Sequence, residues 1–489
     1  MSASPTVSLV LGNDLPDAAA RRITYAFRLF CAVYGFTPSA QEGDAVLCYA
    51  AEAQRPQEIG LAATYVPRSS AEPAPAPRFV ALESGRPAAW GGGTRFPVFS
   101  PLEEDGSPDW LAEIFEWVSA AHEHSVVERD SVGRIPFGAT LHGRYGLDPT
   151  VPYAALAMAA LNRAIRAALG DGWPELPVPP WGGSSRFAVA VTHDVDFLPV
   201  GPWAVLRRFS KNAAQAAIVR RDPRLLGSIL ASAVRSLGGD VWLNDSLRRV
   251  RAREREAGIA STLTIICRRA HRRDANYDVE DRRVLEMLRA LAADGAEIGV
   301  HGSYTSLASR GRLVEEYRKL TELGFEPRGG RQHWLRSVGP ALYRELGEAG
   351  VWYDCTAGYA GAAGFRHGAC FPYPPYDFEA EAPHPFLELP LATMDASLYA
   401  MSRRAPVWGE VCARVMDLAR EHGWGGVSVL WHDTTFSGAQ LPRGIGECFW
   451  GMMRADERWI SAGELTETIW PRYERACLLP KRPAGPRSA

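Results

Sequence analysis

Five short apolar segments after residue 186 each end in side chains that can bind metals or transfer protons. In chain order, the residues at these ends are Thr192, His193, Asp194 and Asp196; His301; Arg331 and His333; Asp395; and His432 and Asp433. Hydrolysis of an amide needs an activated water, a polarised carbonyl and a proton for the leaving amine, and carboxylates, imidazoles and a divalent metal supply all three. One such ending would carry little weight, but five in succession indicate a common site.

The elements that must position these residues follow a regular alternation of short apolar segments and helical patterns. Strands are expected at 187–194, 261–267, 296–302, 352–356, 386–395 and 427–433, and a less regular one at 326–334. This pattern predicts an α/β fold, a distorted and partly open barrel of about seven parallel strands. In such a barrel the chemistry lies at the carboxyl ends of the strands, where the polar residues stand.

A Pro- and Gly-rich segment, ELPVPPWGGSS at 175–185, predicts a boundary between two domains. Residues 1–180 form the first, a smaller α/β domain of unknown role, and residues 186–472 form the barrel. The basic, Pro-rich tail at 473–489 is expected to be disordered, and residues 66–93 to form an exposed loop. His122 and His124 fall on different faces of a helix, which favours a solvated helix end over a metal site.

Residues 203–239 are predicted to form one or two basic amphipathic helices. Their cationic residues are Arg207, Arg208, Lys211, Arg220, Arg221, Arg224 and Arg235. Two interpretations stay open, because such a surface can make a peripheral contact with a membrane or an anionic glycan, or can simply be solvated. Runs of charge are more often solvated, so the second interpretation is favoured.

Composition excludes several classes of protein. The 54 Lys and Arg residues nearly balance the 56 Asp and Glu residues, so no basic excess indicates a nucleic-acid partner. The eight cysteines are scattered without a C-x-x-C pair, which favours free thiols in a reducing compartment. No basic residue precedes the first apolar segment and no long apolar stretch is present, so we expect no transmembrane segment and a cytoplasmic location.

The order of motifs over about residues 186–470 resembles the NodB-homology polysaccharide deacetylases, metal-dependent enzymes that remove acetyl groups from amino sugars on a distorted α/β barrel. THDVD is similar to the first family motif, which implies Asp194 as general base and Asp196 as metal ligand. IGVHGSYTS is similar to the second, which implies His301 as a ligand. Thr305 occupies the place of the family's second ligand histidine, and threonine is a poor ligand for zinc.

GGRQHWLR is similar to the third family motif, which implies that Arg331 orients the base and that Trp334 lines the sugar groove. The family usually has proline where this chain has Gln332 and His333, and His333 offers a possible third metal ligand.

Two further segments resemble family motifs nearer the end of the barrel. LPLATMD places Asp395 where the family keeps a carboxylate near the motif arginine. SVLWHD resembles the last motif, which implies His432 as general acid, and the ordinary pKa of histidine suits that role.

The segment at 353–377 is rich in Gly, Tyr and Pro and is expected to form a long loop at the barrel mouth. Arg366 and His367 within it are candidates for substrate contact. Packing of the loop against itself is an equally open interpretation.

Together these features predict a hydrolase acting on carbon-nitrogen bonds other than peptide bonds. It would remove acetyl groups, N-acetyl in preference to O-acetyl, from a carbohydrate or glycoconjugate, with a divalent metal ion, most plausibly zinc, as cofactor. An alternative follows from Thr305: an inactive barrel that binds glycans or assists assembly in polysaccharide synthesis. A third possibility makes the N-terminal domain the working part and the barrel its scaffold.

Overall fold

The computed structural model describes residues 4–12, 15–41, 43–49, 59–61, 76–81, 95–100, 108–182, 184–198, 202–236, 245–336 and 339–482. Most of the predicted loop at 66–93 and residues 483–489 of the predicted tail lie outside these ranges. Within the described part of the chain, no helix is both long and apolar enough to cross a bilayer.

The N-terminal part combines a small parallel sheet with helices, as predicted. The sheet has the order β2-β1-β3-β4, and β5 and β6 form a separate antiparallel pair. The strands are β1 (Thr6–Leu11), β2 (Thr37–Ser39), β3 (Ala45–Tyr49), β4 (Ile59–Leu61), β5 (Arg78–Ala81) and β6 (Arg95–Val98). The helices are α1 (Asp17–Tyr34), α2 (Trp110–Ser119), α3 (Ala121–His124), α4 (Leu141–Tyr145) and α5 (Tyr153–Leu169), with a 3₁₀ turn at Phe137–Ala139.

The second part is built on a curled sheet in which all neighbouring strands are parallel, so the predicted fold class is confirmed. Eight strands follow the order β14-β11-β10-β9-β8-β7-β16-β15, and β17 is attached to β7. Their bounds are β7 (Phe187–Val195), β8 (Thr262–Ile265), β9 (Glu297–Gly302), β10 (Gly329–Gln332), β11 (Tyr353–Asp354), β14 (Leu387–Glu388), β15 (Leu391–Met394), β16 (Gly425–Leu430) and β17 (Glu457–Ile460). A short antiparallel pair, β12 (Tyr376–Asp377) and β13 (Ala382–Pro383), lies outside this sheet.

The two edge strands of the curled sheet, β14 and β15, are joined by only Leu389 and Pro390. The Leu389 N–H donates to the Asp354 carbonyl beside β11, and the Ser428 N–H of β16 donates to the Pro390 carbonyl, each at 2.8 Å. The chain itself therefore bridges the two edges of the sheet. The single strand predicted at 386–395 is wrong, because Pro390 has no N–H to donate and separates two strands that lie at opposite edges.

Strand β7 is shared by three neighbours. Its first half, Phe187–Ala190, pairs with β17, and its second half, Thr192–Val195, pairs with β8 along the same edge. The opposite edge pairs with β16. The β17 strand was not predicted, and it fills the place beside β7 that β8 leaves open.

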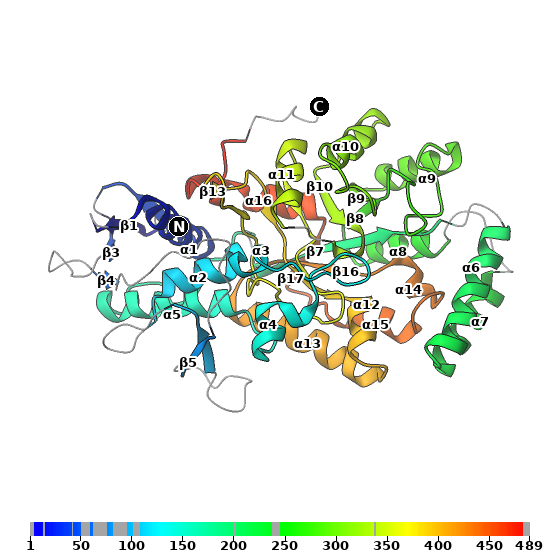
Figure 1. Ribbon diagram of the computed structural model, residues 1–489, viewed down its shortest axis with the longest axis horizontal. Coiled ribbons are helices and arrows are strands. Elements are labelled where there is room, and N and C mark those ends of the chain that lie inside the picture. Colours follow the sequence, from blue (N-terminus) through cyan, green and yellow to red (C-terminus); the bar gives the residue numbers. More distant parts are fainter. Residues whose placement is uncertain are drawn as a thin grey trace.

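Helices connect and cover the strands of the curled sheet. They are α6 (Pro202–Ala214), α7 (Pro223–Ser236), α8 (Asp245–Glu256), α9 (Arg282–Ala293), α10 (Arg312–Glu322), α11 (Pro340–Ala349), α12 (Asp395–Met401), α13 (Ala405–His422), α14 (Asp433–Ser437), α15 (Arg443–Gly451) and α16 (Ala462–Arg475). The basic helices predicted at 203–239 are α6 and α7, linked through a π-helical turn at Gln215–Val219; residues 237–239 and the side chain of Arg235 lie outside the described part. In Figure 1 this hairpin stands at the end of the molecule opposite the N-terminal sheet.

The two parts of the chain share one apolar core. Side chains of α1, α2 and α5 belong to the same buried cluster as those of β7, β16, α13 and α16. Trp424, which precedes β16, donates its indole N–H to the Val33 carbonyl of α1 at 2.7 Å. The segment near residue 180 therefore marks a change of sheet but not a break in the core.

The expected start of a disordered tail at residue 473 needs correction. Helix α16 continues to Arg475, and Tyr473, Leu478 and Leu479 are all buried. Burial of these apolar side chains fixes the segment to the core, which composition alone did not reveal.

Candidate functional site

The end of β7 carries two carboxylates on one face of the sheet. Asp194 and Asp196 are two residues apart, and side chains alternate along a strand, so both point the same way. His193 points to the opposite face, where its Nε2 contacts Glu254 Oε1 of α8 at 2.7 Å. In THDVD, the two aspartates therefore lie on one face of the sheet and His193 lies on the other.

Strands β9 and β10 bring the next residues to the same edge. His301 and Arg331 are partners in the parallel register of β9 and β10. His333 follows Arg331 by two residues and directly follows β10. The carboxyl edges of β7, β9 and β10 therefore collect two acids, two histidines and an arginine, as the sequence predicted.

Asp194 is buried and held by two donors. Its Oδ1 accepts hydrogen bonds from Arg331 Nη1 at 2.9 Å and from Thr264 Oγ1 at 2.6 Å, while its Oδ2 lies 3.6 Å from His301 Nε2. Burial disfavours the charged form, but His301 and Arg331 outweigh it and lower the pKa of Asp194 to about 2. One oxygen is thus anchored, the other faces His301, and the group is ionised at neutral pH.

The rings of His301 and His333 face each other. His301 Nδ1 lies 3.0 Å from the Arg331 carbonyl, and His333 Nε2 lies 2.7 Å from the Arg273 carbonyl. A carbonyl only accepts, so each ring carries its proton on that nitrogen. In the neutral rings, the two remaining nitrogens direct lone pairs at each other across 2.8 Å. This arrangement is unfavourable unless a proton or a metal ion lies between the two nitrogens, and imidazoles that donate to backbone carbonyls are typical metal ligands.

Asp196 completes a set that fits a divalent metal. The ligand atoms of Asp196, His301 and His333 lie within 4.8 Å of one another. Asp196 Oδ1 is 3.3 Å from His301 Nε2 and 3.4 Å from His333 Nδ1, and among the described residues it has no hydrogen-bond partner. Two ligands of tetrahedral zinc are about 3.4 Å apart when the bonds are about 2.1 Å long. The donor set suits zinc or a similar ion, and the two distances from Asp196 match it, whereas the imidazole nitrogens at 2.8 Å lie closer together than two ligands of a bound ion.

His432 forms a pair with Asp395. Its Nδ1 lies 2.9 Å from Asp395 Oδ1, its backbone N–H donates to Oδ2 of the same carboxylate at 2.8 Å, and its Nε2 lies 3.6 Å from Asp196 Oδ2. Burial disfavours the imidazolium, but Asp395 outweighs it and raises the pKa of His432 to about 10. The expectation that Asp395 lies near Arg331 is corrected, because β15 pairs with β16 and so delivers Asp395 to His432.

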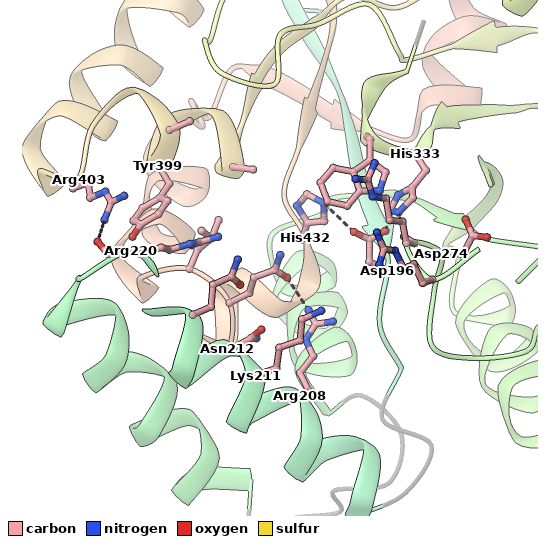
Figure 2. Close-up of a pocket in the computed structure, with 18 residues that line it drawn as sticks. Asp196, Arg208, Lys211, Asn212, Arg220, Asp274, His333, Tyr399, Arg403 and His432 are labelled. Atoms are coloured by element: carbon pink, nitrogen blue, oxygen red, sulfur yellow. Dashed lines mark hydrogen bonds and ion pairs between the residues drawn. The ribbon is translucent and has the colours of Figure 1, made fainter. Parts of the chain in front are cut away.

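A cavity of about 670 Å³ opens beside these groups. Asp196, His333, Trp334 and His432 line one end of it, as Figure 2 shows for the labelled residues Asp196, His333 and His432. Asp194, together with His301 and Arg331, is buried behind this surface. The indole of Trp334 is 42% exposed, and its backbone has a φ of 66°, a left-handed conformation that is unusual for a residue with a side chain.

The predicted substrate contacts Arg366 and His367 lie elsewhere. Both are buried: Arg366 Nε and Nη2 donate to the two oxygens of Glu123 at 2.9 and 2.7 Å, and His367 Nδ1 contacts the Tyr373 hydroxyl at 2.5 Å. Neither lines the cavity. The loop turns these side chains toward the N-terminal helices, so the interpretation as loop packing fits better than substrate contact.

One contributor was missed from the sequence. Thr264 anchors Asp194, and the alternation of STLTIIC places it on the same face as that acid, which gave a usable signal. Arg208 and Lys211 of α6, and Arg220 after the π-helical turn, line the cavity; they belong to the basic set for which contact with an anionic glycan was left open.

Comparisons with known proteins give limited similarity. No model of a known protein family matches the chain, and no curated protein matches it either. Among solved structures, a protein assigned as a polysaccharide deacetylase from Mycobacterium smegmatis is 16% identical with a TM-score of 0.38, covering 63% of this chain and 96% of that one. A second, assigned likewise, from Pseudomonas aeruginosa PAO1, is 16% identical with a TM-score of 0.36, covering 60% and 95%. The chain is thus loosely similar to two proteins that carry this assignment.

Proposed function

We propose that the protein is a metal-dependent hydrolase that removes acetyl groups, N-acetyl in preference to O-acetyl, from a carbohydrate or glycoconjugate. The observation that carries this proposal is the pair of facing imidazoles, His301 and His333, closed by Asp196 beside the cavity. A buried ionised acid, Asp194, and a histidine paired with a carboxylate, His432, stand on either side of this set.

Asp194 serves as the general base in this proposal. Arg331 and Thr264 hold its Oδ1, which leaves Oδ2 to accept a proton from water next to His301. Arg331 also donates through Nε to the Cys355 carbonyl at 2.8 Å, which fixes the guanidinium and with it the direction of the Asp194 carboxylate. Arg331 is thus a positioning residue.

His432 serves as the general acid. Asp395 accepts a hydrogen bond from Nδ1–H and favours the imidazolium, so the Nε2 proton is available to the leaving amine on the side of Asp196. Asp395 acts through His432 and is also a positioning residue. Positioned acids and bases of this kind each accelerate a reaction by roughly 10² to 10⁴-fold.

Asp196, His301 and His333 would hold the cation, and zinc suits two nitrogen ligands and one oxygen ligand. A divalent cation there supplies Lewis acidity toward water and toward the carbonyl of the acetyl group. All eight cysteines are free thiols, which supports our further proposal that the protein works in a reducing compartment such as the cytoplasm.

The test measures bound metal by elemental analysis and acetate release from acetylated amino sugars on the purified full-length protein. Wild type should hold about one ion per chain and release acetate; Asp194→Asn should keep the ion and lose acetate release, while His301→Ala should lose both. His422→Gln, a histidine of α13 away from the site, is the matched control and should retain both. No ion after dialysis against zinc, combined with binding of glycans, would instead favour the inactive glycan-binding barrel that Thr305 suggests.

The outer face of the α6–α7 hairpin supports a separate proposal about peripheral contact. Ile218, Val219 and Val234 are 72%, 73% and 69% exposed, and Arg221 and Arg224 are exposed beside them. We propose that this apolar and basic face contacts an anionic lipid surface. Wild type should sediment with phosphatidylglycerol vesicles and not with phosphatidylcholine vesicles, and Ile218→Ser/Val219→Ser should weaken sedimentation; equal sedimentation with both lipids contradicts the proposal.

A further inference from the structure

The cavity beside the candidate site is lined by more positive charge than its carboxylates balance. Its carboxylates are Asp196 and Asp274. Its six cationic side chains are Arg208, Lys211, Arg220, Arg272, Arg273 and Arg403. Asp274 is already engaged, because its oxygens accept from the backbone N–H groups of Ala270, His271 and Tyr304. Two carboxylates outside the lining in the described part of the chain, Asp433 near Arg208 and Asp222 near Arg403, offset part of this charge without forming ion pairs with those arginines, and the lining itself keeps a positive excess.

Several of these cations lack a carboxylate partner among the described residues. Among the residues that the structure describes, Arg208, Lys211, Arg220 and Arg403 form no ion pair with a carboxylate. Arg208 Nε and Arg220 Nη1 are buried and have no hydrogen-bond partner in the described part of the chain. Buried guanidinium nitrogens without partners are costly, so they are expected where a ligand supplies the acceptor.

Three of these cations are held in place before any ligand arrives. Arg208 donates to Gln440 Oε1 at 2.8 Å and stacks over Phe197 at 4.1 Å from the ring centre. Arg220 and Arg403 lie against the ring of Tyr399 at 5.2 and 5.3 Å, and Arg403 also donates to the Arg220 carbonyl at 2.7 Å. Together with Lys211 of α6, they form a largely preformed surface, here called the cationic wall.

The cationic wall extends along the cavity from the candidate site to its other end. Figure 2 shows Arg208 and Lys211 rising from α6, with Arg220, Tyr399 and Arg403 at the end away from Asp196 and His333. A ligand that spans the cavity would meet the metal-ligand set at one end, Arg208 and Lys211 along its length, and Arg220 and Arg403 at the other end. A neutral ligand would leave the cations desolvated and unpaired.

We propose that the acylated sugar recognised here carries an anionic group, a phosphate or a carboxylate, which Arg208, Lys211, Arg220 and Arg403 bind. This inference rests on the proposed hydrolase function and specifies its substrate class. Guanidinium groups suit both anions, because their paired N–H donors match two oxygens of either group.

The experiment measures binding without turnover, by titration calorimetry on full-length Asp194→Asn. Three ligands share the N-acetyl ring: N-acetylglucosamine, its 1-phosphate and N-acetylglucosaminuronic acid. We expect at least one anionic sugar to bind about 30-fold or more tightly than the neutral one, since two or more charge-assisted bonds form. Whichever of the two anionic sugars binds more tightly identifies phosphate or carboxylate as the recognised group.

Substitutions test whether the cationic wall causes the preference for anionic over neutral sugars. Arg208→Gln and Arg220→Gln should each weaken binding of the anionic sugar about tenfold or more and leave the neutral sugar unaffected. Arg207→Gln and Arg224→Gln replace exposed arginines of the same hairpin that do not line the cavity, and should change neither affinity.

Equal affinity for neutral and anionic sugars overturns the inference, and so does inorganic phosphate that binds as tightly as the sugar phosphate. If wild type releases acetate but shows no anion preference, only this inference fails. If the preference is present but neither bound metal nor acetate release is found, only the proposed hydrolysis fails.

Discussion

Two buried polar clusters in this molecule are built from the same residue types and differ in what surrounds them. One is the candidate site. The other, here called the junction cluster, consists of Glu123, Arg366, His367, His122 and His142, and lies where α3 and α4 meet the loop that follows β11. In the junction cluster Arg366 satisfies both oxygens of Glu123 and donates to the Gly358 carbonyl at 3.2 Å.

The histidines show the difference most clearly. In the candidate site, His301 and His333 each donate a hydrogen bond to a backbone carbonyl. These bonds orient the two rings so that their other nitrogens face each other. In the junction cluster, His122 has no hydrogen-bond partner within the described chain, and burial lowers the pKa of both His122 and His142 to about 3. No member of the junction cluster lines the cavity. Histidine rings that are oriented by hydrogen bonds and lie beside a cavity indicate a binding or catalytic role. Histidine rings that are buried away from any cavity, as in the junction cluster, indicate a structural role.

The largest expected effect separates the clusters by activity. Asp194→Asn removes the proposed base while keeping the shape of the side chain, so acetate release should fall by about 10³-fold, within the range for general bases. Glu123→Gln, the matching change in the junction cluster, should leave both turnover per folded protein and bound metal unchanged. Acetate assays and elemental analysis of both variants check this, and comparable turnover in the two would remove the distinction.

For the free energy of unfolding we expect the opposite order: a change in the junction cluster should matter more than one in the candidate site. Arg366→Met leaves the buried Glu123 carboxylate without its guanidinium, which should lower the free energy of unfolding by roughly 3–5 kcal/mol. Metal content of the folded fraction should stay at the wild-type level. Urea unfolding checks the prediction, and a double variant that adds Glu123→Gln should recover part of the loss. A stable Arg366→Met protein that lacks metal would contradict it.

Acid should weaken the junction cluster through its neutral histidines. The folded pKa of about 3 for His122 and His142 lies below the ordinary value of 6.5, so between these values the unfolded chain binds more protons. Stability should therefore fall as the pH drops below about 6.5, by roughly 2 kcal/mol for each ring at pH 5. Urea unfolding of wild type and His122→Leu at pH 7 and pH 5 measures this, and identical pH dependence in the two proteins would count against it.

The smallest effect concerns Thr305. Its Oγ1 is buried without a hydrogen-bond partner in the described chain, so Thr305→Val should leave stability unchanged or raise it by up to about 1 kcal/mol. Bound metal should also be unchanged, since the proposed ligand set of Asp196, His301 and His333 does not include Thr305. Loss of the ion in Thr305→Val would assign Thr305 to the metal site.

The parts of the fold that the sequence predicted are those with a strong local signal. Strands such as FAVAV and EIGV are continuous apolar runs and fit the buried strands of a parallel sheet. By contrast, β17 is ERWI, half polar, and was not predicted, and for β10, GGRQ, only a less regular strand at 326–334 was expected; both are strands through pairing with their neighbours. Local pattern cannot reveal pairing of that kind.

The same distinction holds for the candidate site. Pairs two residues apart, such as Asp194 with Asp196 and Arg331 with His333, follow from strand alternation and were predicted. The partner of Asp395 depends on which strand lies beside β15, and the direction of Arg366 depends on the path of a long loop. Both are set by tertiary packing, which places Asp395 on His432 and Arg366 on Glu123, and the local pattern carries no information on either.

The sharing of β7 between β8 and β17 has a consequence for how the protein is made. During synthesis, the Phe187–Ala190 edge of β7 exposes unpaired backbone groups until β17, far along the chain, has emerged. Such an edge is a template for strand addition by another chain. Pairing across this distance also slows folding. The nascent protein is therefore prone to aggregation over most of its translation, and its yield in cells should depend on chaperones that cover this edge.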